Sequence, residues 1–127
     1  MLLINLMSNS NKTSVNVMGS NFAIDSRYEI IDAVGSGAYG VVVAANDKEA
    51  KEEEPEQVAI KKIEKAFEHV IFTKRTLREL KIMRLLKHEN VLGLSNILQP
   101  DSRKDFKDIY VVSELMETDL SSIIKSP

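Results

Sequence analysis

The sequence of 127 residues predicts an α+β fold, in which a five-stranded antiparallel sheet carries one main helix. Two observations support this. Short runs rich in β-branched residues alternate with turns rich in glycine, proline or charge, as in sheets with tight connections. One longer stretch lacks turn residues and repeats apolar side chains at helical spacing. The elements follow in the order β-β-β-α-β-β, which indicates one domain.

The composition excludes several classes of protein. The hydrophobic share of 43% and the charged share of 28% are those of an ordinary globular domain. The chain has no cysteine, so nothing requires an oxidising compartment, and we expect the cytoplasm or the nucleus. A net charge of -2 offers no general attraction for nucleic acid or anionic membrane. No apolar run approaches the ~20 residues of a membrane-spanning helix.

Residues 1–27 are expected to form a disordered tail. Asparagine and serine dominate there without a period of two or 3.6, and such a segment buries too little apolar area to offset its ordering entropy. The apolar run Met1–Met7 follows no basic stretch and precedes no small-residue cleavage site, so we interpret it as part of this tail and not as a secretory leader.

Three strands come next. Tyr28–Val34 and Val41–Ala45 flank a glycine-rich turn and predict an antiparallel hairpin. The segment Asp47–Glu56 holds six acids, two lysines and Pro55, and is interpreted as a solvated loop without an assigned function. Gln57–Ile63 is the third strand.

The main helix is predicted over Phe72–Lys87, and two further strands over Val91–Leu98 and Ile109–Leu115. A polar turn over 100–108 separates these strands, and Leu120–Lys125 begins a short helix. One face of the main helix collects five residues at helical spacing: Phe72, Thr76, Glu79, Met83 and Leu86.

The glycine-rich turn is the first candidate for function. Gly35-Ser36-Gly37-Ala38-Tyr39-Gly40 matches G-x-G-x-x-G, a pattern without Cβ atoms where backbone N–H groups approach phosphate oxygens. Alone it also fits a dinucleotide-binding fold or an ordinary flexible hairpin. The run Val41-Val42-Val43 continues it as a strand and not as a helix, which favours a flap over a nucleotide.

A second motif stands in the third strand. Val58-Ala59-Ile60-Lys61 matches the strand lysine of protein kinases, which neutralises the α- and β-phosphates of ATP. A lone strand lysine is usually a solvated edge residue. Lys61 needs an anionic partner to be held over phosphates, and the helix offers Glu79 on its inward face.

Three further segments, Lys74–Leu80, His88–Val91 and Leu115–Leu120, complete a resemblance to the mitogen-activated protein kinase family of CMGC serine/threonine kinases, over Tyr28–Pro127. The resemblance implies a protein-kinase-like N-lobe over residues 28–127, with the hinge and the start of the helix that kinases call αD. The main helix would be αC, and the C-lobe is absent. The implied cofactor is ATP, and the implied partners of a full-length form are an upstream kinase and protein substrates.

The resemblance implies catalytic roles for Lys61 and Glu79, as an ion pair. Asp119 would accept from the ribose hydroxyls, and Met83 and Leu94 would stack in the apolar spine between the lobes. The implied nucleotide-binding residues are Val34, Gly35, Ser36, Gly37, Ala38, Tyr39, Gly40, Val41, Val42, Ala59, Lys61, Ser113, Glu114, Met116 and Asp119.

Within this set, the resemblance implies separate tasks. The Glu114 carbonyl and the Met116 amide would bond the adenine edge, and Ser113 would guard the pocket behind adenine, where the family more often has a larger side chain. Arg78 and Arg75 would help to hold a phosphorylated activation segment. The adenine ring would be sandwiched from above by Val34, Val42 and Ala59.

The family pattern is incomplete in this chain. H-R-D, D-F-G and A-P-E do not occur, and Asp105-Phe106-Lys107 is interpreted as a surface turn. Without a catalytic aspartate and metal ligands, we expect no phosphoryl transfer and weak ATP binding. Mg²⁺ would be bound in a full-length form only, and we nominate no metal ligand here. Apolar surface that packs on the second lobe in the family should be exposed.

Two interpretations remain. The first is a fragment of a serine/threonine kinase, because Pro127 interrupts a helix that has just begun. The second is a non-catalytic binding module that engages kinase regulators. The sequence alone does not separate them.

Overall fold

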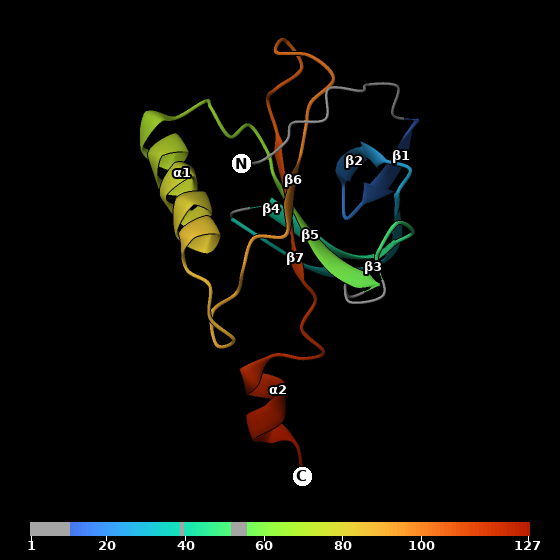
Figure 1. Cartoon of the computed structure of the whole chain (residues 1–127), viewed down its shortest axis with the longest axis vertical. Coiled ribbons are helices and arrows are strands. Elements are labelled where there is room, and N and C mark those ends of the chain that lie inside the picture. The colour runs from blue at the N-terminus through green and yellow to red at the C-terminus, as the bar shows by residue number, and fades with distance from the viewer. Residues whose placement is uncertain (1–10, 39, 52–55) are drawn as a thin grey trace.

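The computed structural model describes residues 11–38, 40–51 and 56–127. Predictions that concern Met1–Met7, Tyr39 and residues 52–55 therefore lie outside the described residues. Two sheets and two helices are present in the described part (Figure 1). The elements are β1 Lys12–Val17, β2 Ser20–Asp25, β3 Tyr28–Gly37, β4 Gly40–Asp47, β5 Gln57–Ile63, α1 Val70–Leu85, β6 Asn96–Leu98, β7 Ile109–Glu114 and α2 Leu120–Lys125.

The main sheet has five strands in the order β3-β4-β5-β7-β6, and every neighbouring pair is antiparallel. The predicted α+β class and the five-stranded sheet with one main helix are confirmed. Several boundaries differ from the prediction: β3 extends to Gly37, β4 covers Gly40–Asp47, and α1 ends at Leu85. Only Asn96–Leu98 of the predicted strand Val91–Leu98 pairs with β7, and α1 begins at Val70, two residues before the predicted start. His88 and Val91 instead form an isolated bridge that turns the chain back toward the sheet.

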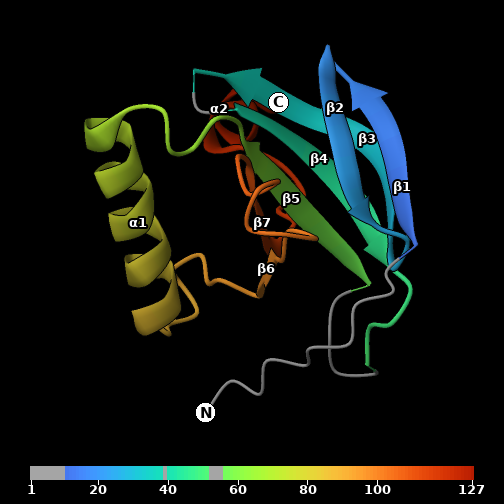
Figure 2. The same cartoon turned by 90° about the horizontal axis from the view of Figure 1, so that it is seen from above.

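The two faces of the main sheet are covered by different elements. In Figure 2, α1 lies on one side of the sheet and the β1–β2 hairpin on the other. Because side chains alternate along a strand, each face has its own core. The hairpin face holds Phe22, Ile24, Tyr28, Val41, Val43, Ala45, Val58, Ile60 and Val112. The α1 face holds Ile63, Ala66, Ile109 and Val111, with Phe72, Leu80, Met83 and Leu94 packed against them.

The β1–β2 hairpin corrects the prediction of disorder, which is wrong for residues 11–27. Val17 and Ser20 are paired across a two-residue turn, Met18-Gly19, in which both residues have positive φ, the geometry that suits the twist of a hairpin. Phe22 is 0% exposed and stabilises the sheet by apolar burial. A period of two was present in β2 after all, but one of its three buried positions is a serine: Ser20, Phe22 and Ile24.

The two helices leave much apolar surface uncovered. Thr76 is the one buried residue of α1, while Val70, Ile71, Leu77, Ile82 and Leu85 are exposed. The short α2 extends away from the sheet (Figure 1), and its Leu120, Ile123 and Ile124 are exposed. This agrees with the expected exposure of apolar surface. Neither of the helices that the structure describes is long and apolar enough to cross a membrane.

Candidate functional site

An open hollow of about 340 Å³ lies under the turn between β3 and β4. Its floor is a lysine of β5 and its roof is the glycine-rich turn. Around Gly35 and Gly37, an added Cβ would meet no atom within 4 Å, so the space beside this backbone is open to a ligand. The residues that line the hollow are Gly35, Ser36, Gly37, Gly40, Val42 and Lys61, all six of them nominated from the sequence.

Gly40 has a different task from the other two glycines. Its φ is +120°, and a Cβ built there would lie 1.9 Å from the carbonyl oxygen of Lys62. No side chain fits in such a gap, so glycine is required for β4 to enter the sheet beside β5. Gly40 therefore fixes the turn above the hollow to the strand that carries Lys61.

Lys61 and Glu79 form an ion pair across the hollow's inner side. The Nζ of Lys61 donates to the Oε1 of Glu79 at 2.9 Å, with the two side chains 30% and 48% exposed. A pair this exposed contributes about 0–1 kcal/mol to stability. Its value lies instead in geometry, since it holds a cation at the hollow while leaving it accessible to an anion.

The strand register explains how Lys61 reaches this place. Lys61 is paired with Val42 on β4 and with Val111 on β7, so its side chain emerges on the α1 face of the sheet. Two residues earlier, Ala59 is paired with Ser113 and shares that face. Alternation thus brings together four of the nominated residues on one surface: Val42, Ala59, Lys61 and Ser113.

Alternation also places one nominated residue elsewhere. The side chain of Val41 points to the hairpin face and is buried in the core there, so only its backbone remains near the glycine-rich turn. Ala38 is exposed in the turn itself. Val34 lies at a register shift of β3, where the strand bulges between Ala33 and Gly35, and is exposed.

The remaining nominated residues do not line the hollow among the residues that the structure describes. Glu114 ends β7 and Met116 is exposed just after it. Asp119 caps α2: its carboxylate accepts from the backbone N–H of Ser122 at 2.9 Å and from the Ser122 hydroxyl at 2.7 Å. The hydrogen bond from that hydroxyl is the main cause that lowers the pKa of Asp119 below its ordinary value.

Helix α1 is held against the sheet close to Glu79. Met83 and Leu94 pack on the same core cluster, and the backbone N–H of Leu94 donates to the Met83 carbonyl at 3.3 Å, so these two predicted spine residues are adjacent. Arg75 and Arg78 are exposed on the helix.

The sequence patterns assigned no role to Lys62, although two consecutive lysines in a strand indicate that one of them must face the other side of the sheet.

Comparison of the sequence with known proteins shows which family this chain is similar to. A family model described as "Protein kinase domain" matches residues 28–126. "Extracellular signal-regulated kinase 1" of Dictyostelium discoideum is 51% identical over 87% of this chain and 20% of its own length. "Mitogen-activated protein kinase 3" of Oryza sativa subsp. japonica is 46% identical over 97% of this chain and 32% of its own. The chain thus spans between a fifth and a third of the length of these relatives.

Proposed function

Because the chain belongs to the protein kinase family and forms the N-lobe of a mitogen-activated protein kinase, we propose that it binds the phosphates of ATP between its glycine-rich turn and Lys61. The observation that carries the proposal is the Lys61–Glu79 ion pair under a turn with open space at Gly35 and Gly37. An ammonium held at one side and backbone N–H groups at the other are what a polyphosphate requires.

The described surface also fits the base of the nucleotide. Val42 and Ala59 lie on the face that carries Lys61 and would offer apolar contacts, and the small side chain of Ser113, on the same face, would leave room beyond them. The backbone of Glu114 and Met116 would bond the adenine edge. Among the described residues, no group of three or more acidic or histidine side chains is placed to hold a metal ion, and we nominate no Mg²⁺ ligand in this lobe. Since protein kinases hold Mg²⁺ with the D-F-G aspartate and a catalytic-loop asparagine, the metal would be bound in a full-length form.

We further propose that the 127 residues do not transfer phosphate by themselves. A kinase needs an aspartate that accepts the substrate's hydroxyl proton, and this sequence contains no H-R-D and no D-F-G. In a full-length form, the same lobe would serve phosphoryl transfer from ATP to serine or threonine, with an upstream kinase and protein substrates as partners. Incubation with labelled ATP and a generic substrate should give no incorporation; incorporation that Lys61→Met abolishes would contradict this.

Titration with ATP, monitored by the fluorescence of the protein or of a nucleotide analogue, tests the binding proposal. The unaltered chain should bind, and Lys61→Met should weaken binding about tenfold or more, since it removes a charge-assisted contact. Lys104→Met is the matched control, because this lysine is exposed in the turn between β6 and β7. Equal affinities for all three proteins, or no binding by the unaltered chain, would refute the proposal.

The second candidate, a non-catalytic module that engages kinase regulators, is favoured by one observation. Apolar side chains are exposed along both α1 and α2, as on a surface that packs against another protein or lobe. If the coding sequence continues in frame past Pro127 and encodes H-R-D and D-F-G, this surface would be the contact with the second lobe of an enzyme. A stably folded 127-residue chain that binds a regulator without binding ATP would favour the module.

A further inference from the structure

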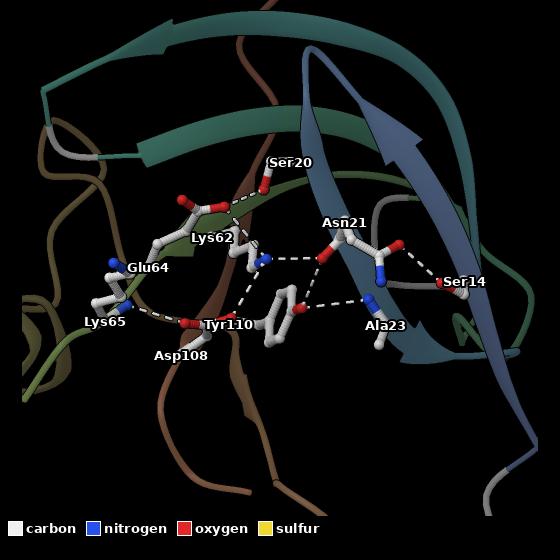
Figure 3. A network of polar contacts seen from close by, with 9 residues as sticks. All are labelled: Ser14, Ser20, Asn21, Ala23, Lys62, Glu64, Lys65, Asp108 and Tyr110. Carbon is white, nitrogen blue, oxygen red and sulfur yellow. Dashed lines mark hydrogen bonds and ion pairs between the residues drawn. The ribbon is translucent and has the colours of Figure 1, made fainter.

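Lys62, the neighbour of Lys61 in β5, is buried on the opposite face of the sheet. Its side chain is 6% exposed and lies against the β1–β2 hairpin (Figure 3). A buried ammonium is costly unless each of its three N–H groups meets an acceptor. Three oxygens lie within reach: the Asn21 carbonyl at 2.7 Å, Glu64 Oε1 at 3.3 Å and Asp108 Oδ2 at 3.3 Å.

The surroundings of Lys62 keep it charged. Burial alone would lower the pKa of Lys62, but Tyr110 and the hydrogen bonds to Asp108 and Glu64 together raise it above its ordinary value. The rings of Phe22 and Tyr110 also lie beside the ammonium, with centroids at 5.9 and 5.8 Å. The charged ammonium therefore links three segments of the chain, which contain Asn21, Glu64 and Asp108.

One set of contacts fastens the β1–β2 hairpin to the main sheet. Besides the Asn21 carbonyl bonded by Lys62, the Ser20 hydroxyl donates to Glu64, and the Ala23 N–H donates to the Tyr110 hydroxyl at 3.2 Å. Figure 3 shows these contacts joining β2 to the end of β5 and the start of β7. The hairpin is thus fastened to β5, the strand that carries Lys61, and to its neighbour β7.

A second set of contacts leads from Lys62 toward α1. Asp108, which pairs with Lys62 through Oδ2, accepts through Oδ1 from the backbone N–H of Lys65 at 2.9 Å. Lys65 has a φ of +50°, unusual for a residue with a side chain, so this bond holds the turn after β5 in a strained conformation. The next residue, Ala66, accepts from the Thr73 hydroxyl of α1 at 2.8 Å.

We propose that Lys62 is a positioning residue through which the β1–β2 hairpin and the turn after β5 set α1, and with it Glu79, at bonding distance from Lys61. Without the Lys62 charge, the Glu64 and Asp108 carboxylates repel each other, Asp108 leaves the Lys65 N–H, and the turn that leads into α1 relaxes. The inference rests on the proposed function only for its consequence in nucleotide binding; the spacing itself is a property of the free chain.

Zero-length cross-linking tests this spacing directly. A carbodiimide activates a carboxylate, and an amine in contact with it then forms an amide, so the yield of the Lys61–Glu79 linkage, measured by mass spectrometry on the whole chain, reports their contact. Lys62→Met, which keeps the apolar stem, should lower this yield about fivefold, the size of a moderate coupling between neighbouring sites. Lys62→Arg should restore more than half of it, and Lys104→Met should leave it unchanged.

An unchanged yield in a folded Lys62→Met chain would overturn the proposal, and failure of Lys62→Arg to restore the yield would count against it. If Lys62→Met does not fold, Asp108→Ala decides, because it leaves Lys62 and the hairpin core in place but removes the acceptor of the Lys65 N–H. A lowered yield supports the proposal and an unchanged one overturns it. The assay contains no nucleotide, so its result is independent of whether ATP binds.

Discussion

Replacement of Gly40 by alanine should lower the free energy of unfolding substantially, whereas the same change at Gly37 should not. A Cβ at residue 40 would stand 1.9 Å from the Lys62 carbonyl oxygen, and its φ of +120° is unfavourable for alanine. The backbone conformation alone costs about 1–3 kcal/mol. Relief of the overlap must move β4 from β5 and lose at least one ladder hydrogen bond, about 1 kcal/mol more.

The expected loss for Gly40→Ala is therefore about 3 kcal/mol, a large part of the ~5–15 kcal/mol that holds a domain folded. In a domain of this size, it corresponds to a thermal unfolding midpoint lowered by roughly 11 °C. Urea unfolding followed by circular dichroism measures it, with the m-value checked for constancy. Gly37→Ala is the control: its added methyl meets open space, so stability should be unchanged or raised by up to ~1 kcal/mol.

The two glycines should also separate in function. Gly37→Ala should weaken ATP binding in a fully folded chain, because its methyl occupies space that the proposed phosphates need. A Gly40→Ala chain that loses less than ~1 kcal/mol would refute the close-approach argument. A Gly37→Ala chain that binds ATP as well as the unaltered one would refute the assignment of that open space to phosphate.

Three further predictions concern the hairpin, acid stability and the pocket. Phe22→Ala should cost about 3–5 kcal/mol in urea unfolding, because the ring is fully buried, whereas Met18→Ala at the exposed hairpin tip should cost almost nothing; equal effects would contradict the packed hairpin. The bidentate hydrogen bonds from Arg27 lower the pKa of Asp47 below its ordinary value, so this carboxylate adds stability above that ordinary value that is lost as the pH falls through the lowered pKa. Asp47→Asn should flatten that part of the pH–stability curve, and an unchanged curve would exclude the pair as a source of acid sensitivity. Ser113→Met should weaken inhibitors with bulky groups behind the adenine site about tenfold in competition with ATP, and unchanged affinity would mean that no such cavity exists.

The main sheet was predictable because its signals are local. Short motifs predicted the glycine-rich turn, the lysine of the third strand and the inward-facing acid of the helix. Together they predicted that Lys61 and Glu79 would form a pair, and the two side chains are 2.9 Å apart. Strand alternation, applied to Val41 and Val42, would have excluded the first from the hollow by its side chain. Bounds were less accurate, since the predicted start of α1 rested on periodicity, and the helix begins two residues earlier with the exposed Val70 and Ile71.

The hairpin and Lys62 were not predictable in the same way. Asparagine and serine hide the alternation in β2, and the positive φ of Met18 gives no sign in a single sequence. Whether the second of two adjacent lysines is solvated or buried depends on what covers the far face of the sheet. That cover comes from residues whose composition indicated disorder, so the misassignment of residues 11–27 removed Lys62 from consideration as well.

The packed hairpin separates the boundary of the matched domain model, residue 28, from the boundary of the folding unit. The protein kinase family model begins at residue 28, yet a chain cut there would lose Phe22 and Ile24 and leave the Lys62 ammonium facing water beside a bared apolar sheet. Such a shortened protein would bear the whole recognised domain and still lack the material that closes one of its two cores. Expression trials of this chain would do better to start upstream of Lys12.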